Sequence, residues 1–220
     1  MRLRRHRPLV AVLATATALP LVLLAQAGGA TADDGTRGVD QTARQAARYQ
    51  ATITRTSHGI PHVVADSWGS LGFGHGYATA ETNLCNLADT LVTGRGERSR
   101  WFGPDARYED QVTLSATNLQ TDALFTDIRN RHVVEDLLAD PVRGPGAQAK
   151  AMVRGYVAGV NQYLDDIGGP DEVKDPTCRG AGYLARTATA KDLWYGVYAA
   201  NLLASTGPPM SSRYWFTPAT

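Results

Sequence analysis

The chain has 220 residues, with 22 Lys and Arg against 21 Asp and Glu, so its formal net charge is only +1. Four of the arginines lie in the first seven residues, which leaves the remainder at about −3. This balance excludes the basic surface that nucleic-acid binding requires. The length is enough for one ordinary domain with its own core.

Residues 1–32 have the pattern of a secretory signal peptide. A basic start precedes an apolar run over residues 8–27, and Ala30-Thr31-Ala32 supplies the small-residue motif that signal peptidase cleaves. The apolar run approaches the roughly 20 residues that span a bilayer, but its proline, the nearby threonines and the cleavage motif argue against an uncleaved anchor. We therefore expect a secreted, extracellular chain that begins at Asp33 and has no membrane segment after cleavage.

A β-hairpin is predicted shortly after a polar leader at residues 33–41 and one or two helical turns at 43–49. Runs rich in β-branched residues at 51–56 and 60–65 flank a turn that contains glycine. Pro61 begins the second run, which is tolerated where the strand is at an edge. This hairpin is expected to lie on a partner sheet.

The spacing of apolar residues predicts that most of the remaining chain is helical. A first helix is expected at residues 68–93, and one or two more at 121–139. The clearest amphipathic pattern covers 149–167. The pattern Thr189-x-x-Asp192 resembles a capping box before a helix that ends near Ser205. That last helix is apolar on nearly all sides and is therefore expected to be buried on all sides.

Two domain boundaries follow from these patterns. Residues 33–206 form one folded region, whereas the tail at 207–220 follows neither a helical nor a strand period and is expected to be irregular. No internal repeat is present.

Cys85 and Cys178 are the only cysteines in the sequence. Export takes such a pair into an oxidising compartment, where it most often forms a disulfide. Closing a loop of this length would contribute about 4–5 kcal/mol. The alternative is two buried free thiols.

Three groups of residues have spacings that partly match nucleotide-binding or metal-binding motifs. The glycines from Gly72 to Gly76 follow a helical start and lack the third spacing of a nucleotide-binding loop, so close backbone packing is the better interpretation. His58 and His62 are four residues apart, the spacing of two metal ligands on one helix face, but Pro61 opposes a helix there. A site formed by His62, His75, Cys85 and Cys178 matches no standard zinc spacing, so a disulfide and structural histidines are the better interpretation. No metal or other cofactor is predicted.

The sequence motifs do not identify a catalytic nucleophile. Serine, histidine and aspartate are all present, so a catalytic triad is not excluded by composition, but no Gly-x-Ser-x-Gly elbow selects one serine. The residues alone therefore predict a secreted α+β domain, mostly helical with one β-hairpin, and no self-contained catalytic site.

Two consecutive stretches carry a resemblance to a known family. Residues 53–65 and 71–84 resemble the opening of the penicillin acylase family, a group of N-terminal-nucleophile hydrolases. Residues 85–104 are similar to the branch that contains aculeacin A acylases and acyl-homoserine-lactone acylases. The resemblance is strong over residues 53–104 and weaker to about Ser205.

The resemblance implies the chemistry and the fold of the complete enzyme. Members are exported precursors that cut themselves into an α-chain and a longer β-chain, whose N-terminal serine is the nucleophile and whose free α-amine is the base. The complete fold has four αββα layers, to which this α-chain region would contribute outer helices and a hairpin. A late helix of the α-chain lines the acyl pocket, which assigns Leu202 and Leu203 to contact with an aliphatic acyl chain; ordinary core packing is the alternative for each.

By this resemblance the chain is expected to be the α-chain part of an amidohydrolase that cleaves a lipopeptide, an acyl-homoserine lactone or a penicillin. The catalytic serine belongs to the β-chain, so the expected partners are that β-chain and a hydrophobic acyl substrate, and the chain alone is expected to be inactive. Calcium sites occur in parts of the family, but no ligand is placed here. A secreted helical binding module and a non-functional truncated fragment are the alternatives.

Overall fold

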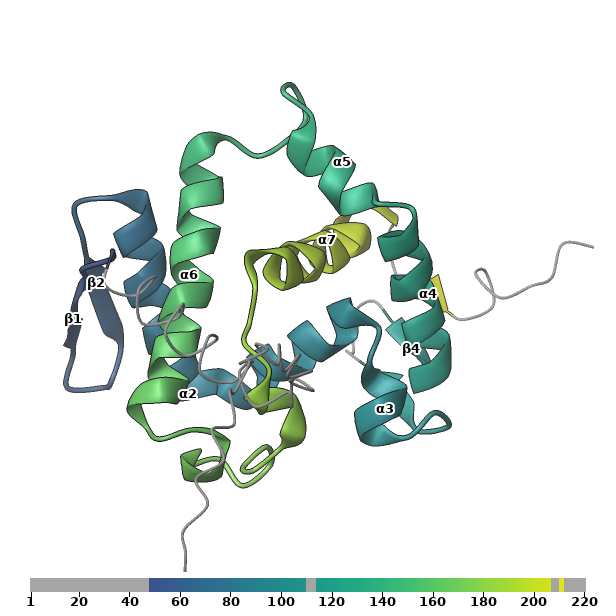
Figure 1. Ribbon diagram of the computed structural model, residues 1–220, viewed down its shortest axis with the longest axis horizontal. Coiled ribbons are helices and arrows are strands. Elements are labelled where there is room, and N and C mark those ends of the chain that lie inside the picture. The colour runs from purple at the N-terminus through teal and green to yellow at the C-terminus, as the bar shows by residue number, and fades with distance from the viewer. Residues whose placement is uncertain (1–47, 110–113, 207–209, 212–220) are drawn as a thin grey trace, which may run out of the picture. The chain divides into compact units, whose positions relative to one another are not determined.

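The computed structural model describes residues 48–109, 114–206 and 210–211. This part of the chain is mostly helical, with a β-hairpin and a second small sheet (Figure 1). The predicted fold class is confirmed. The strands are β1 (Thr52–Arg55), β2 (Pro61–Val64), β3 (Arg107–Glu109), β4 (Leu114–Thr117) and β5 (Met210–Ser211). The helices are α2 (Trp68–Arg95), α3 (Arg98–Phe102), α4 (Asn118–Asn130), α5 (Val133–Ala139), α6 (Ala147–Asp166) and α7 (Ala190–Thr206), with 3₁₀ turns η1 (Pro170–Glu172) and η2 (Gly182–Ala185).

The expected signal peptide, the leader and the helical turns before Arg48 lie outside the described residues. No helix within the described ranges is long and apolar enough to cross a membrane.

The predicted hairpin is confirmed. β1 and β2 pair antiparallel, with Thr52 opposite Val64 at the open end. Gly59 adopts a φ of 79° in the turn, a left-handed conformation that costs glycine little. The hairpin packs on α2, where a Cβ added to Gly74 would lie 2.6 Å from Val63 Cγ1. In the described part of the chain, a helix thus supports the hairpin in place of the expected sheet.

Glycines let α2 and α6 lie side by side (Figure 1). A Cβ on Gly72 would sit 2.0 Å from the carbonyl oxygen of Met152, and one on Gly159 would sit 2.0 Å from that of Phe73. No real side chain approaches a backbone oxygen this closely, so only glycine allows the two backbones to meet. The same contact also contains Gly69, Gly76 and Gly155. The glycine-rich start of α2 is therefore a packing surface, as predicted.

The main core lies where α2, α6 and the segment before α7 meet. α2 bends at Asn83, whose φ of −150° and ψ of 34° are not helical. Directly after this bend, Cys85 forms a disulfide with Cys178, with the two Cα atoms 5.5 Å apart. The bond holds the loop before η2 against α2. The larger buried side chains of this core are Leu84, Leu91, Val157, Val160, Tyr163, Val173 and Leu184.

The three-stranded sheet β3–β4–β5 was not predicted. β3 pairs antiparallel with β4, and β4 pairs in parallel with β5. β5 lies inside the tail that we expected to be irregular, so that expectation is wrong at Met210 and Ser211. A strand of two residues has no period to detect, and its pairing comes from backbone groups that every residue carries.

The predicted helical region at 121–139 consists of two helices. α4 begins with a capping box, in which Gln120 N donates to Thr117 Oγ1 at 3.2 Å and Thr117 N donates to Gln120 Oε1 at 3.0 Å. Asp122 in its first turns accepts hydrogen bonds from the backbone of Arg98 and Ser99, both at 2.7 Å, and so fastens the start of α3 to α4.

α7 is not buried on all sides by the described residues, so that expectation is wrong for this part of the chain. Tyr195 is 0% exposed, whereas Val197, two residues further on, is 38% exposed. Residues two apart in a helix point to different sides, so α7 buries one side and leaves apolar groups open on another.

Candidate functional site

A capping box fixes the first turn of α7, the helix to which the sequence analysis assigned substrate contact. Asp192 N donates to Thr189 Oγ1 at 3.2 Å, and Thr189 N donates to Asp192 Oδ2 at 3.1 Å. The Thr189 hydroxyl also donates to that carboxylate oxygen at 2.7 Å. The box predicted from Thr189-x-x-Asp192 is thus present.

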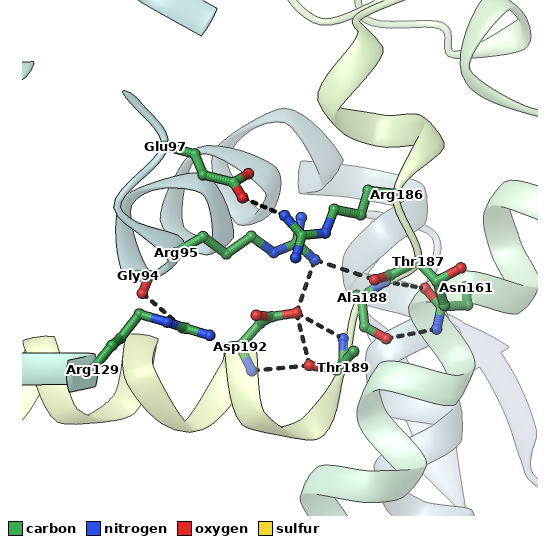
Figure 2. A network of polar contacts seen from close by, with 10 residues as sticks. All are labelled: Gly94, Arg95, Glu97, Arg129, Asn161, Arg186, Thr187, Ala188, Thr189 and Asp192. Carbon is green, nitrogen blue, oxygen red and sulfur yellow. Dashed lines mark hydrogen bonds and ion pairs between the residues drawn. The ribbon is translucent and has the colours of Figure 1, made fainter. Parts of the chain in front are cut away.

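The same carboxylate forms a buried ion pair with the end of α2 (Figure 2). Arg95 Nη2 donates to Asp192 Oδ2 at 2.8 Å and to the carbonyl oxygen of Thr187 at 3.2 Å. The side chains of Arg95 and Asp192 are 3% and 5% exposed. Burial opposes ionisation of Asp192, but the hydrogen bond and charge of Arg95 and the Thr189 hydrogen bonds outweigh it, so the pKa of Asp192 is lowered. The ion pair therefore fixes the start of α7 to the end of α2.

α6 holds the segment before α7 from the other side. Asn161 Nδ2 donates to the carbonyl oxygen of Ala188, and Ala188 N donates to Asn161 Oδ1, both at 2.9 Å (Figure 2). A side-chain amide that bonds both backbone groups of one residue fixes that residue in two directions. Together with the Cys178 disulfide, these bonds attach the 178–189 segment at both of its ends.

A second polar cluster fixes the middle of α7 to α5. Tyr195 is fully buried, and its hydroxyl donates to Glu135 Oε2 at 2.7 Å, while Lys191 Nζ lies 2.6 Å from Glu135 Oε1. Partial burial opposes ionisation of Glu135, but the hydrogen bonds from Lys191 and Tyr195 outweigh it and lower the pKa of Glu135 to about 2. Burial, followed by the bond to Glu135, raises the pKa of Tyr195 to about 12. The neutral phenol and the carboxylate thus form a stable hydrogen bond at neutral pH.

Arg129 completes this contact from α4. Its guanidinium carbon lies 4.3 Å from the centre of the Tyr195 ring, and Nη1 donates to the carbonyl oxygen of Gly94 at 3.1 Å. One side chain therefore contacts both α7 and the end of α2. The position of α7 is fixed from α2, α4, α5 and α6.

The C-terminal half of α7 contributes to an apolar cluster. Leu202 is half-buried and packs against the cluster whose buried members are Phe125, Ile128, Val134 and Tyr195. The side chain of Leu203 lies outside the described residues. The structure thus places Leu202 beside an apolar wall, and its contact with an acyl chain stays a prediction.

No nucleophile, base and acid come together within the described ranges. Ser57 Oγ lies 3.3 Å from His58 Nδ1, but both residues are exposed neighbours in the hairpin turn. Cys85 and Cys178 are bonded to each other and are not available as metal ligands. In the part of the chain that the structure describes, no group of three or more His, Cys, Asp and Glu residues is arranged to hold a metal ion.

The residues that position α7 were largely missed by sequence reasoning. Thr189 and Asp192 carried a local signal, the capping-box spacing. The sequence around Arg95 indicated only the end of a helix. Its ion-pair partner could not be predicted, because Asp192 lies 97 residues further along the chain. Asn161, a polar residue in the best amphipathic pattern, was a detectable exception to that pattern and could have indicated a buried hydrogen bond.

The fold is the one seen in penicillin acylases. A chain of the thermostable penicillin G acylase from Alcaligenes faecalis matches with a TM-score of 0.54 and 22% identity, over 72% of this chain and 76% of that chain. The α+β fold that the sequence predicts is confirmed by this likeness to a penicillin acylase chain.

Sequence comparison identifies the family. The profile of the penicillin amidase family matches residues 50–206, and the chain therefore belongs to this family. Aculeacin-A acylase of Actinoplanes utahensis is 39% identical over 176 residues, which are 78% of this chain and 21% of that protein. Acyl-homoserine lactone acylase PvdQ of Pseudomonas savastanoi pv. phaseolicola is 43% identical over 122 residues, which are 56% of this chain and 14% of that protein. The chain thus spans about a fifth or less of the length of these relatives.

Proposed function

We propose that this chain supplies the α-chain part of an exported acylase that hydrolyses the amide bond of an aliphatic N-acyl substrate. The observation that carries the proposal is the family match over residues 50–206, together with identity to an aculeacin-A acylase and to acyl-homoserine lactone acylases. These names indicate a substrate in which an acyl chain is joined through an amide bond to an amine leaving group. The penicillin-type relative at 29% identity supports the same reaction on a third class of amide.

The nucleophile is proposed to come from a β-chain partner. Of these two relatives, 79% and 86% respectively lie outside the match to this chain. Among the described residues, no serine, histidine and carboxylate come together as a catalytic triad. The matched chain of penicillin G acylase is similar in length to this one, because the match covers comparable shares of both. On this proposal the chain alone does not hydrolyse amides.

Leu202, and Leu203 beside it, are proposed to contact the acyl chain. Leu202 is half-buried and packs against the cluster of Phe125, Ile128 and their neighbours, which together form an apolar wall. An apolar wall of this kind suits an alkyl chain, which gains free energy on leaving water. The fixed position of α7, held by the Arg95–Asp192 pair and by Tyr195, would keep this wall in place.

Export is proposed from the signal-peptide pattern of residues 1–32. The localisation proposal is tested by expressing the full chain in an actinobacterial host and sequencing the N-terminus of the product in the medium. Asp33 as the first residue supports export with cleavage. Accumulation of uncleaved chain in the cell membrane contradicts it.

The activity proposal is tested by reconstitution. The purified chain is mixed with the part of aculeacin-A acylase that it does not match, and hydrolysis of fluorogenic acyl amides with chains of 4 to about 14 carbons is followed. Activity only in the mixture supports the proposal, and activity of the chain alone contradicts it. Leu202→Trp should shift the preferred acyl chain to shorter lengths, because the larger side chain takes up space along the proposed acyl-binding wall. Val142→Trp, at a position that is 88% exposed, is the matched control.

A further inference from the structure

A small pocket lies in the main core, between α2, α6 and the segment that leads into α7. Its volume is about 20 Å³, enough for a single water molecule. Most of its lining is apolar, and the side chains with polar groups are those of Arg95, Asn161, Tyr183 and Arg186. Its apolar lining includes Leu91 of α2, Val160 of α6 and Leu184 of η2.

Arg95, which lines this pocket, carries an unused hydrogen-bond donor. Its Nη2 group is bonded to Thr187 and Asp192 (Figure 2). Its Nε group is fully buried and has no hydrogen-bond partner among the residues that the structure describes. A buried N–H group without a partner is rare in folded proteins, because burial removes the water to which it would bond. A buried donor on a residue that lines the pocket is consistent with an acceptor held there.

Asn161 offers a second polar contact on the α6 side. Its amide makes two hydrogen bonds, both with Ala188. A side-chain amide has two N–H donors and two acceptor lone pairs, so one donor and one lone pair of Asn161 are left for another partner. A buried water needs two to four polar partners, and Arg95 and Asn161 together reach that minimum.

The charges of the lining decide between a water and a small anion. Arg95 is paired with Asp192, and Arg186 is paired with Glu97. Both guanidinium groups are thus already neutralised by a carboxylate. An added chloride would bring an uncompensated negative charge into a largely apolar pocket, which is unfavourable. A neutral acceptor avoids this cost.

We propose that this pocket is a hydration site, in which one ordered water accepts a hydrogen bond from Arg95 Nε and bridges to the side-chain amide of Asn161. The water links α2 to α6 directly beside the Arg95–Asp192 pair. It completes the polar network that holds the start of α7, and Arg186, whose side chain is 55% exposed, lies at the outer rim of the pocket.

The test observes the Nε–H group of Arg95 in the full chain labelled with ¹⁵N-arginine. The Arg95→Lys variant lacks this group and so identifies its NMR signal, and Arg131, whose side chain is 71% exposed, is the matched control. The proposal expects the Arg95 signal to exchange slowly and to show an NOE to water of the sign that a long-lived bound water gives. The Arg131 signal should show only exchange with bulk water.

Two results would overturn the proposal. One is a protected Arg95 signal with no NOE to water. The other is a saturable shift of that signal when gluconate is replaced by chloride at constant ionic strength, which would identify an anion site. Should Arg95→Lys fail to fold, a crystal structure of the unchanged full chain decides the question. Density for a water about 3 Å from Arg95 Nε supports the hydration site, and a dry pocket contradicts it.

Discussion

Arg95 and Asp192 form a buried ion pair across 97 residues of sequence, with Nη2 and Oδ2 2.8 Å apart. The arginine ends the helix that forms the centre of the main core, and the aspartate begins the helix proposed to contact the acyl chain. The position of α7 therefore depends on this directional hydrogen-bonded ion pair as well as on apolar packing.

Removing one partner of this pair should be strongly destabilising. Asp192→Asn leaves Arg95 charged and buried, and breaking a buried pair in this way costs about 3–5 kcal/mol. Urea unfolding followed by circular dichroism measures the change. Asp127→Asn, which breaks an exposed pair with Arg131, is the control and should change the unfolding free energy by less than about 1 kcal/mol. Equal effects of the two substitutions would refute the structural role of the buried pair.

The glycine contact between α2 and α6 should not tolerate even one methyl group. Gly159→Ala places a Cβ 2.0 Å from the carbonyl oxygen of Phe73, so the two helices must separate. We expect a loss of about 1–3 kcal/mol from this overpacking, or more if the helices cannot adjust. Gly146→Ala is the control, because no atom lies within 4 Å of its added Cβ. A thermal melt of both variants makes the comparison, and a stable Gly159→Ala chain would contradict the packing described here.

The Cys85–Cys178 disulfide should contribute much of the stability of the chain. The cross-linked residues are 93 apart in sequence, and the entropy of closing such a loop is worth about 4–5 kcal/mol. The double variant Cys85→Ser, Cys178→Ser should lose a large part of this amount in urea unfolding. The parent chain treated with a reductant should lose a similar amount, whereas the variant should not respond to reductant. Unchanged stability in both cases would show that the bond does not constrain the fold.

Glu135 should make the chain sensitive to acid. Its pKa is lowered from 4.5 to about 2, so the folded state favours the ionised form. The stabilisation is complete well above pH 4.5 and is lost as the pH falls from about 4.5 towards 2. Glu135→Gln should reduce the loss of unfolding free energy between pH 5 and about pH 3. Asp136→Asn, the exposed neighbour, is the control, and an identical acid response of parent and Glu135→Gln would contradict the assignment.

The sequence predicted the local parts of this fold well. α6 follows from its 3.6-residue apolar period, the start of α7 from the spacing of Thr189 and Asp192, and the hairpin from β-branched runs around Gly59. Each of these features depends on neighbouring residues, which is why a pattern reveals it. The disulfide was also expected, because the chain has only one pair of cysteines.

The features that could not be predicted depend on distant partners. The Arg95–Asp192 pair and the Tyr195–Glu135 bond join residues 97 and 60 positions apart. The β3–β4–β5 sheet includes a two-residue strand that pairs through its backbone alone. α7 was expected to be buried on all sides because its composition is apolar. Composition does not show whether the residues that pack against an apolar helix belong to the same chain. Val197 shows that the described residues cover only part of that helix.

The most direct test of the proposed α-chain role is a chimeric precursor. Residues 50–206 replace the corresponding segment of aculeacin-A acylase, and self-cleavage and hydrolysis of an acyl amide are measured, with the unaltered precursor and an Asp192→Asn chimera in parallel. The account predicts a chimera that cleaves itself and hydrolyses acyl amides, and a weakened Asp192→Asn chimera. A chimera that folds into a soluble, cooperative protein but neither cleaves itself nor hydrolyses the amide would contradict it.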